Sequence, residues 1–299
     1  MQKLEQIKQL LKENNINYIL NEYMKNHTTF KIGGMATIYC EIENIQTICT
    51  IINYCNKEQI KYYLLGNGSN IIFSDKGYDG IIIKIICKDI YVENNTIIAQ
   101  SGASLSDLCK FAQAQGLGGL EFAYGIPGTV GGAIYMNAGA YGGEIKDVVS
   151  EVTYINNSGK LKTYIKDELN FEYRKSIFTK TNECITNAKF VLVEKDKNEI
   201  KNKMEDLLKQ RNSKQPLDMP SAGSTFKRPV GAFAGKLIED CNLKGYTVGD
   251  AQISTKHSGF VVNIGNATCE DVIDLTNDVK KIVKEKTGFT LDREIKIIE

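Results

Sequence analysis

A glycine-rich run between residues 115 and 145 constrains the fold more than any other feature of this sequence. The run is QGLGGLEFAYGIPGTVGGAIYMNAGAYGGEI, and its glycine content is far above the average of about one residue in fourteen. Glycine at this density weakens any helix or strand, because an ordered glycine loses more backbone entropy than other residues. Tight turns would account for one or two of these glycines. The cluster indicates a ligand that lies on the backbone, where N–H groups bind phosphate oxygens and a flat ring approaches the chain.

A second glycine loop, GNGSN at residues 66–70, follows the apolar run YYLL and precedes IIF. This arrangement is typical of an anion-binding turn between extended segments. The loop matches neither GxGxxG nor GxxxxGK[ST], so it fits neither an ordinary Rossmann site nor a P-loop NTPase. Two glycine-rich loops in one mixed lobe favour a large phosphorylated cofactor such as a dinucleotide.

Composition and charge are those of an ordinary globular protein, with no bias toward nucleic acid. The chain of 299 residues is 42% hydrophobic and 24% charged, with 37 basic and 36 acidic side chains. This length allows two or three lobes, since single cores stop growing near about 250–300 residues. No run approaches the roughly 18 apolar residues of a membrane span, and the N-terminal MQKLEQIKQLLKENN predicts an amphipathic helix instead of a signal peptide. We therefore expect a cytoplasmic protein.

The cysteines and histidines form no pattern typical of disulfides or metal sites. The eight cysteines are scattered and form no CxxC pair, so we expect buried reduced thiols. The two histidines, His27 and His257, lie far apart, and neither belongs to an HExxH pattern. We therefore expect no metal.

Hydrophobic periodicity predicts an α+β fold. Helical spacing of apolar residues recurs in 4–11 and in 45–55, and short β-branched runs predict strands between and after these helices. The two types mix without a strict βαβα rhythm, which favours α+β over a doubly wound sheet. The predicted strands are 61–66, 80–86, 95–102, 151–156, 160–165 and 189–194.

The pattern changes at residue 197, where a charged helix begins that ends in a polar stretch with proline. This helix is the best candidate for a domain boundary. Beyond it, the sequence predicts a strand at 257–265 and a helix opened by Thr268, with Asp271 completing a capping box and Gly288 ending the helix. The segment LDREIKII then alternates as a strand, with Glu294 on its polar face.

Three charged side chains are candidates for anion binding. Arg174 lies among aromatic residues in FEYRKSIF, where its planar fork would clamp a carboxylate or a phosphate. The alternative is a rim arginine stacked on Tyr173. Arg211 and Lys214 precede SAGSTFKRP, and they form either a solvated face or a site for a diphosphate-bearing substrate.

Ser224 in SAGSTFKRP has several possible roles: nucleophile, phosphate ligand, proton donor or turn residue. Ser224, Asp250 and His257 occur in the order that α/β-hydrolases use for nucleophile, acid and base. Against a hydrolase, AGSTF lacks the second glycine of GxSxG. A third hypothesis is a module that binds a nucleotide-sugar without turnover.

Several short motifs occur in order across nearly the whole chain. Together they resemble the UDP-N-acetylenolpyruvoylglucosamine reductase family, the MurB flavoenzymes of peptidoglycan precursor synthesis in cell-wall biogenesis. Each motif alone is weak evidence, whereas the set is specific. The motifs are HTTFKIGG (27–34), GNGSN (66–70), LEFAYGIPGTVGGAIYMNAGAYGGEI (120–145), YRKSIF (173–178), SAGSTFKRP (221–229), KHSGFVVN (256–263) and LDREIKII (291–298).

The resemblance implies an FAD-binding region of two α+β subdomains, of the vanillyl-alcohol-oxidase/PCMH type, followed by an α+β substrate-binding domain. The corresponding ranges are 1–88, 89–196 and 197–299, with the C-terminal strand returning to the active site. NADPH would reduce the FAD, and the enolpyruvyl group of UDP-N-acetylglucosamine enolpyruvate would then be reduced to give UDP-N-acetylmuramate. The protein would be a monomer whose partners are these small molecules.

The resemblance also implies the site residues. The family's catalytic positions fall on Arg174, Ser224 and Glu294. The implied substrate-binding residues are Arg211, Lys214 and Arg228. The implied FAD contacts are Gly66, Asn67, Gly68, Ser69, Asn70, Gly125, Ile126, Pro127, Gly128, Thr129, Gly131 and Gly132.

These residue types suit the implied reaction. Hydride addition to the β-carbon of an enol ether places negative charge on the α-carbon, and this charge delocalises into the adjoining carboxylate. Arg174 and a protonated Glu294 would stabilise the carboxylate side, and Ser224 would protonate the α-carbon. The chain resembles the shorter class of the family, which lacks the insertion carrying a lid tyrosine. Arg228 stands where some members have asparagine.

Overall fold

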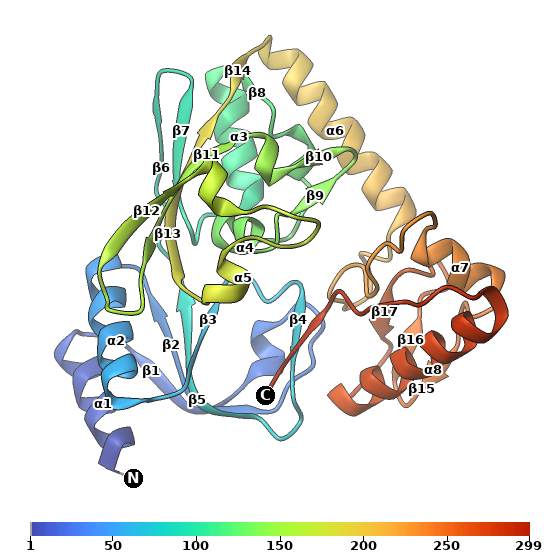
Figure 1. Ribbon diagram of the computed structural model, residues 1–299, viewed down its shortest axis with the longest axis horizontal. Helices are drawn as coiled ribbons and strands as arrows, with labels where there is room; N and C mark the ends of the chain where they lie inside the picture. The colour runs from blue at the N-terminus through green and yellow to red at the C-terminus, as the bar shows by residue number, and fades with distance from the viewer. Residues whose placement is uncertain (1) are drawn as a thin grey trace. The chain divides into compact units, whose positions relative to one another are not determined.

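The protein folds into two compact units, each assembled from separated stretches of the chain (Figure 1). The structure is a computed structural model that describes residues 2–299. Unit 1 comprises Met1–Leu20, Ile38–Gly66 and Gly80–Lys209, and unit 2 comprises Asn21–Thr37, Asn67–Asp79 and Gln210–Glu299. The three consecutive domains predicted from the sequence, 1–88, 89–196 and 197–299, follow a different division and stay a prediction.

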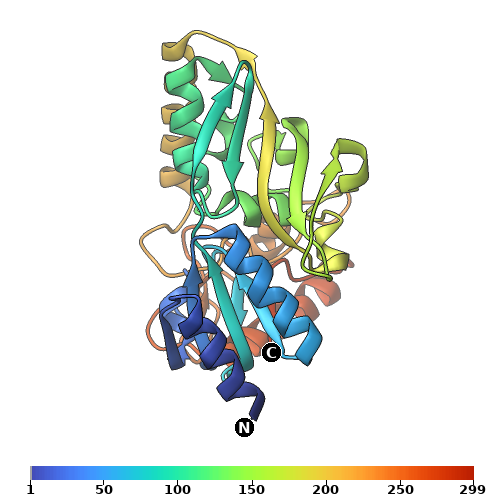
Figure 2. The same ribbon diagram turned by 90° about the vertical axis from the view of Figure 1, so that its left-hand side faces the viewer.

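Unit 1 contains a five-stranded antiparallel sheet with the strand order β12-β11-β13-β7-β6. Side chains alternate between the two faces of a strand, so Val152 and Tyr154 of β11 reach the core. This face packs against α3, α4 and α6, and Figure 2 shows α3 and α6 along it. The bounds are β6 Ile90–Glu93, β7 Thr96–Gln100, β11 Val149–Ile155, β12 Leu161–Ile165, β13 Cys184–Val191, α3 Leu105–Gln115, α4 Val130–Tyr135 and α6 Lys197–Lys214.

A second sheet has the strand order β1-β2-β5-β3, in which β3 and β5 are parallel. Helices α1 and α2 cover its apolar residues in unit 1 with side chains such as Ile7, Ile48 and Ile52. Helix α2 begins after Asn44, whose side chain accepts the N–H of Thr47 at 3.0 Å. The bounds are α1 Gln2–Glu13, α2 Ile45–Glu58, β1 Tyr18–Tyr23, β2 Met35–Ile42, β3 Tyr62–Leu65 and β5 Tyr78–Ile85.

Short elements connect these layers. Strand β8 pairs with β14, and β9 pairs with β10. Their bounds are β8 Leu117–Gly118, β14 Val193–Glu194, β9 Gly139–Ala140 and β10 Gly143–Glu144, with a short helix α5 at Phe178–Thr181 and 3-10 turns η1 Met24–His27, η2 Glu121–Ala123, η3 Ile145–Asp147 and η4 Lys166–Leu169.

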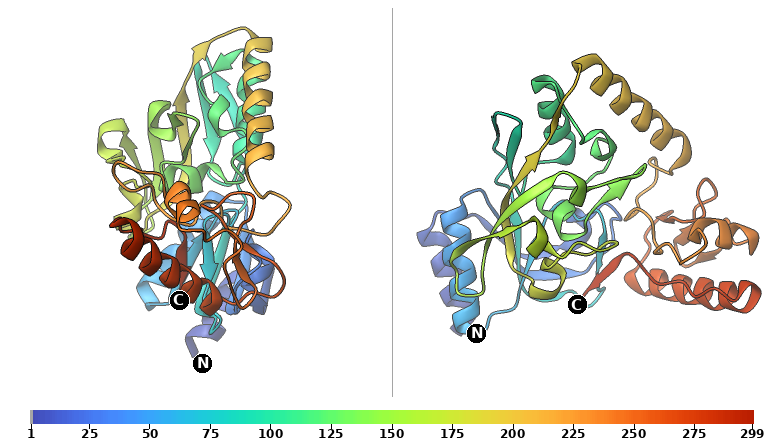
Figure 3. Two further views of the ribbon diagram at one scale, coloured as in Figure 1. Left: turned by 90° about the vertical axis from the view of Figure 1, so that its right-hand side faces the viewer. Right: turned by 45° about the horizontal axis from the view of Figure 1, so that its top comes forward.

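Unit 2 is built around helix α8, which packs against α7 and against strands β15 and β16 (Figure 3). The small sheet has the order β15-β16-β17, and the C-terminal strand β18 pairs in parallel with β4. Phe30, Ile32 and Ile72 join the same core from segments far away in sequence. The bounds are α7 Ala234–Asp240, α8 Cys269–Thr287, β4 Ile71–Phe73, β15 Thr247–Val248, β16 Ala251–Ile253, β17 Val261–Asn263 and β18 Lys296–Ile298.

Helix α8 confirms the prediction made from its capping residues. Thr268 accepts the N–H of Asp271 at 3.0 Å, and the carboxylate of Asp271 accepts the N–H of Thr268 at 2.9 Å. Gly288 ends the helix with φ of +78°, a left-handed conformation that suits glycine. Asp75 adds a second cap from a distant segment, because its carboxylate accepts the N–H groups of Cys269 and Glu270 at 2.9 and 3.0 Å.

The strands predicted between residues 61 and 165 are confirmed within two residues at each end. The strand predicted at 189–194 begins earlier, at Cys184, and breaks before Val193. The strand predicted at 257–265 is shorter, since a turn closed by the Phe260 N–H and the His257 carbonyl occupies its first part. The predicted alternation in LDREIKII is wrong at Glu294, which is 9% exposed and follows no regular strand there.

All eight cysteines are buried and free, so the prediction of reduced thiols is confirmed. Burial raises the pKa of Cys40 to about 12, which keeps this thiol protonated. Within residues 2–299, no helix is long and apolar enough to cross a membrane. Across the same residues, no group of three or more His, Cys, Asp or Glu side chains is placed to hold a metal ion.

Replacement of Asp75 by alanine should destabilise unit 2. The two N–H groups of Cys269 and Glu270 would lose their acceptor, and the positive end of the α8 dipole would lose a carboxylate. We expect the free energy of unfolding in urea to fall by about 1–2 kcal/mol. The matched control is Lys76→Ala at the neighbouring exposed position, which should stay within about 0.5 kcal/mol of wild type. Equal losses in the two variants would contradict this role of Asp75.

Candidate active site

Ser224 and Glu294 are brought together in unit 2 by the backbone of Thr225. The Thr225 N–H donates to the Gly259 carbonyl at 2.9 Å, and the Thr225 carbonyl accepts the N–H of Glu294 at 2.8 Å. The buried hydroxyl oxygen of Thr225 also accepts the N–H of Val261 at 2.9 Å. Ser224 itself is exposed beside this fixed residue. The Ser224 segment therefore lies between the 259–261 segment and the Glu294 segment.

Asn70 of the GNGSN loop lies beside Glu294. The Asn70 side-chain amide donates to the carbonyl of Glu294 at 3.5 Å, and the Asn70 carbonyl accepts the N–H of Lys296 at 3.1 Å. Glu294 is 9% exposed, so its carboxyl group is largely removed from water. A predicted cofactor residue and a predicted catalytic residue thus share one backbone pairing in unit 2.

The HTTFKIGG segment is tied to the same region. The Thr29 N–H donates to the Gly68 carbonyl at 3.2 Å, and the Thr29 hydroxyl donates to the Ser221 carbonyl at 2.7 Å. The Asn263 amide donates to the Phe30 carbonyl at 3.3 Å. Unit 2 therefore brings residues of four other motifs together around the Ser224 loop.

Arg174 lies in unit 1, in a tight turn closed by Glu172 and Lys175. Its φ is +57°, a left-handed conformation that costs a non-glycine residue energy and that often marks functional positions. Its Nη2 donates to the Gly139 carbonyl at 3.2 Å, and its guanidinium lies 5.2 Å from the Tyr173 ring centroid. The contact with Tyr173 that the sequence offered as an alternative is therefore present, and the Gly139 bond orients the guanidinium further.

Asn137 supports the Arg174 turn, a role that no sequence pattern predicted beyond the place of Asn137 in the glycine-rich run. Asn137 is fully buried, and its amide donates to the Glu172 carbonyl at 3.0 Å and to Glu144 Oε2 at 3.1 Å. Its carbonyl oxygen accepts the N–H of Lys146 at 3.0 Å. Burial raises the pKa of Glu144, but hydrogen bonds from Lys146 and Asn137 and the charge of Arg174 outweigh it and lower this pKa overall.

The two glycine loops meet in unit 1. A Cβ atom at Gly66 would lie 2.6 Å from the Thr129 hydroxyl oxygen, so the end of β3 runs directly against the start of α4. A Cβ atom at Gly131 would lie 2.9 Å from Ser101 Cβ. The Ser101 hydroxyl is buried, and it has no hydrogen-bond partner among the described residues. An unsatisfied hydroxyl beside two converging glycine loops fits a bound phosphorylated cofactor such as FAD.

The backbone of the glycine loop at residues 125–132 differs from the expected nest of free donors. The N–H groups that already donate to protein acceptors belong to Ile126, Gly128, Val130, Gly131 and Gly132. At these positions the glycines allow close packing of backbone on backbone, and they do not present free N–H groups. Within the GNGSN loop, Gly66 belongs to unit 1 and Asn67, Gly68, Ser69 and Asn70 belong to unit 2.

The predicted substrate cations lie on two segments of unit 2. Arg211 and Lys214 are in the last turn of α6, where the ammonium of Lys256 donates to the carbonyl of Asn212 at 2.8 Å. The ammonium of Lys256 therefore lies at the same end of α6 as the two predicted cations. Lys256 was not predicted from the sequence, because it is distant from this helix along the chain. Arg228 lies on the loop after Ser224, with its guanidinium 3.9 Å from the centroid of the Phe233 ring.

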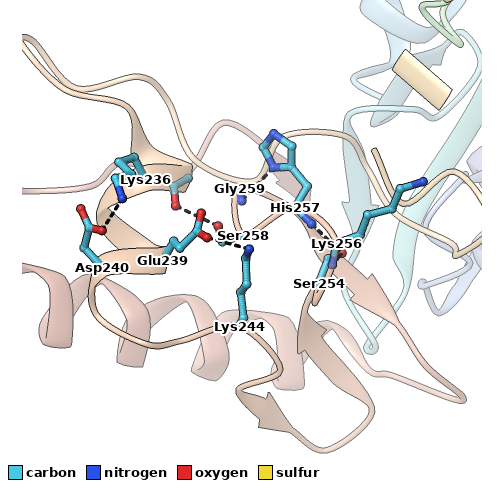
Figure 4. Close-up of polar contacts among 10 residues, drawn as sticks. Lys236, Glu239, Asp240, Lys244, Ser254, Lys256, His257, Ser258 and Gly259 are labelled. Atoms are coloured by element: carbon cyan, nitrogen blue, oxygen red, sulfur yellow. Dashed lines mark hydrogen bonds and ion pairs between the residues drawn. The ribbon is translucent and has the colours of Figure 1, made fainter. Parts of the chain in front are cut away.

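The bonding of His257 contradicts the hydrolase hypothesis. A triad requires the aspartate to accept a ring N–H of the histidine. Instead, His257 Nδ1 accepts the backbone N–H of Gly259 at 3.1 Å, as Figure 4 shows. Asp250 Oδ2 accepts the N–H of Asn266 at 2.7 Å. The order Ser224, Asp250, His257 in the sequence is therefore no triad.

Two substitutions at Asn137 should separate its side-chain bonds from its backbone conformation. Asn137→Gly tolerates the φ of +41° but removes the acceptor of the Lys146 N–H and one of the two donors to the Glu172 carbonyl, so we expect a loss of about 1–3 kcal/mol in urea unfolding. Asn137→Ala adds the cost of a left-handed conformation, about 1 kcal/mol more. Wild-type stability of the glycine variant would show that the buried bonds of Asn137 contribute nothing.

Family models match both parts of the chain. An FAD binding domain model matches residues 36–164, and the model of the UDP-N-acetylenolpyruvoylglucosamine reductase C-terminal domain matches residues 215–298. The fold is therefore α+β, with an FAD-binding domain followed by the C-terminal domain of this reductase.

Known reductases resemble the chain over nearly its whole length. It is 48% identical over 279 residues to UDP-N-acetylenolpyruvoylglucosamine reductase of Clostridium novyi. The matched region covers 93% of this chain and 91% of the relative. The chain is 47% identical over 296 residues to the reductase of Caldanaerobacter subterraneus, covering 99% and 97%. The crystal structure of the reductase from Thermus caldophilus superimposes with a TM-score of 0.81 at 33% identity, covering 95% and 99%. The chain belongs to the UDP-N-acetylenolpyruvoylglucosamine reductase family, and it is an FAD-binding oxidoreductase.

Proposed function

We propose that this protein reduces UDP-N-acetylglucosamine enolpyruvate to UDP-N-acetylmuramate with NADPH, in peptidoglycan precursor synthesis, and that Ser224 supplies the proton. Family membership and the FAD binding domain support the overall reaction. The observation that carries the role of Ser224 is the hydrogen bonding of Thr225. The N–H and the carbonyl of Thr225 are both paired, and they hold the exposed Ser224 beside the buried Glu294.

The chemistry that bound FAD would supply is the relay of a hydride from NADPH to the enolpyruvyl β-carbon. The chain's own residues manage the charge that results. Arg174 donates paired hydrogen bonds to the substrate carboxylate, and protonated Glu294 donates another. The Ser224 hydroxyl then transfers its proton to the α-carbon, and water restores the proton to the serine oxygen.

The cofactor would be held by the two glycine loops and their neighbours. We assign its contacts to residues 66–70 and 125–132, with the hydroxyl of Ser101 as an additional donor. The close approach of Gly66 to Thr129 supports a ligand that touches both loops. The glycines remove side chains that would otherwise occupy this surface.

The substrate diphosphate would be bound by cations of unit 2. Arg211 and Lys214 lie in one helical turn, with Lys256 beside them, and Arg228 lies on the loop that carries Ser224. Phe233 limits the freedom of Arg228, because the guanidinium stacks over its ring. We further propose that the protein works as a cytoplasmic monomer and that no lid tyrosine closes the site.

Ser224→Ala should separate the two half-reactions. Reduction of the flavin by NADPH should stay near the wild-type rate, because Ser224 takes no part in it. Reoxidation by the enolpyruvyl substrate should slow by about 10²–10⁴-fold, since a general acid is lost. Stopped-flow absorbance of the flavin measures both rates.

Ser221→Ala on the same loop is the control. Only its backbone carbonyl is used, to accept the Thr29 hydroxyl, so both rates should match wild type. Equal loss of both half-reactions in Ser224→Ala would make Ser224 structural. Purified protein that shows no flavin absorbance, even after addition of FAD, would remove the proposed function. Stabilisation by the substrate without NADPH oxidation would instead indicate a nucleotide-sugar binding module.

Lys214→Gln should weaken binding of the substrate. Loss of one charge-assisted hydrogen bond to the diphosphate is expected to raise the KM for the enolpyruvyl substrate about tenfold. The KM for NADPH should stay unchanged. The matched control is Lys209→Gln, an exposed lysine of the same helix with the same change in charge. Equal effects of the two variants would show that only the net charge of the helix matters.

A further inference from the structure

The chain has two histidines, His27 in the HTTFKIGG segment and His257, and both lie in unit 2. The proposed reaction does not use His257. A backbone N–H can only donate, so the bond from Gly259 N to His257 Nδ1 at 3.1 Å requires a lone pair on Nδ1. The neutral ring therefore carries its proton on Nε2. A protonated ring would place a hydrogen on Nδ1 and break this bond.

The bond from Gly259 leads directly to the Ser224 loop. The Gly259 carbonyl accepts the N–H of Thr225 at 2.9 Å, and Phe260 forms a bridge with Ser224. The carbonyl of the same residue, Thr225, accepts the N–H of Glu294. His257 thus holds the N–H of Gly259, and the carbonyl of the same glycine accepts the N–H of Thr225.

The ring packs closely against two glycines. A Cβ atom at Gly259 would lie 3.0 Å from the ring atom Cε1, so the ring would have to shift, and a Cβ atom at Gly235 would lie in van der Waals contact with Cε1 at 3.4 Å. Phe260 packs edge-on, with ring centroids 5.0 Å apart. The Ser258 hydroxyl donates to the Gly235 carbonyl at 2.9 Å and ties the turn to α7 (Figure 4).

Charged groups around the ring are largely paired with one another. On α7, Lys236 binds Asp240 at 2.6 Å, and Glu239 binds Lys244 at 2.8 Å. On the histidine's own segment, Lys256 donates to a helix carbonyl. Burial lowers the pKa of His257. A contact of the ring with the backbone of His257 itself opposes this effect, Lys244 lowers the pKa further, and the charge of Glu239 raises it. The ring is therefore neutral at neutral pH.

We propose that His257 is a positioning residue, which in its neutral form holds the Gly259 peptide and through it the Ser224 loop in the geometry for proton transfer. The proposal rests on the proposed role of Ser224. It predicts that reoxidation of the flavin by the enolpyruvyl substrate weakens when the ring takes up a proton. Because the pKa is lowered from its ordinary value of 6.5, this loss occurs below that pH.

Three variants distinguish the acceptor from the ring. Asn places its side-chain oxygen where Nδ1 lies, Gln places it where Nε2 lies, and Phe keeps a ring without an acceptor. His257→Asn should keep the reoxidation rate within about threefold and lose the acidic decline below pH 6.5. His257→Gln and His257→Phe should slow reoxidation by about 10–100-fold, which is the cost of a small misplacement of a catalytic group. Flavin reduction by NADPH should stay unchanged in all three.

A second measurement does not depend on activity. Because the chain holds two histidines, ¹⁵N-histidine labelling gives two ring signals, and His27→Gln assigns them. We expect the His257 ring as the Nε2–H tautomer with a midpoint below pH 6.5. An Nδ1–H tautomer, or equal reoxidation rates in His257→Asn and His257→Phe, would overturn the proposal. Normal reoxidation in Ser224→Ala would refute the proton donor instead, while the tautomer would still report on His257.

Discussion

The hydrogen bonds of Thr225 are the interaction on which the rest of the candidate site depends. The N–H, the carbonyl and the hydroxyl oxygen of this residue are all hydrogen-bonded within unit 2, and the residue is 1% exposed. Buried backbone groups are costly to leave unpaired, so these three bonds fix the chain without using the Ser224 hydroxyl. The hydroxyl is therefore held in place yet remains available for chemistry.

The sequence predicted a good part of this structure. Helix α8 was predictable because its caps, Thr268 with Asp271 and then Gly288, act through neighbouring residues. The burial of Glu294 was not predictable, because the expected alternation of buried and exposed side chains in LDREIKII holds only for a regular strand. Instead, Arg293 forms an isolated bridge with Phe226, and the regular strand begins only at Lys296.

The supporting residues escaped prediction because their partners are distant in the chain. Asn137 binds Glu172, Asp75 caps a helix that starts at Cys269, and Lys256 reaches the end of α6. No local pattern encodes such pairs. The glycine density predicted where close backbone packing occurs, but it did not predict which N–H groups are available to a ligand. Gly131 packs against Ser101, and its N–H already donates to the Ser101 carbonyl.

The proposed chemistry sets two demands against each other. In the proposed roles, Arg174 and Glu294 would lower the barrier to hydride addition by stabilising the negative charge, but the same stabilisation would make the α-carbon a weaker base. Serine is a weak acid, so the proton must be taken by a strong base at short range. A histidine acid would relax this demand, but the His257 ring is committed to a backbone N–H. In the proposed mechanism the rate of proton transfer would therefore depend on the fixed position of Ser224. The backbone hydrogen bonds of the neighbouring Thr225 provide that position.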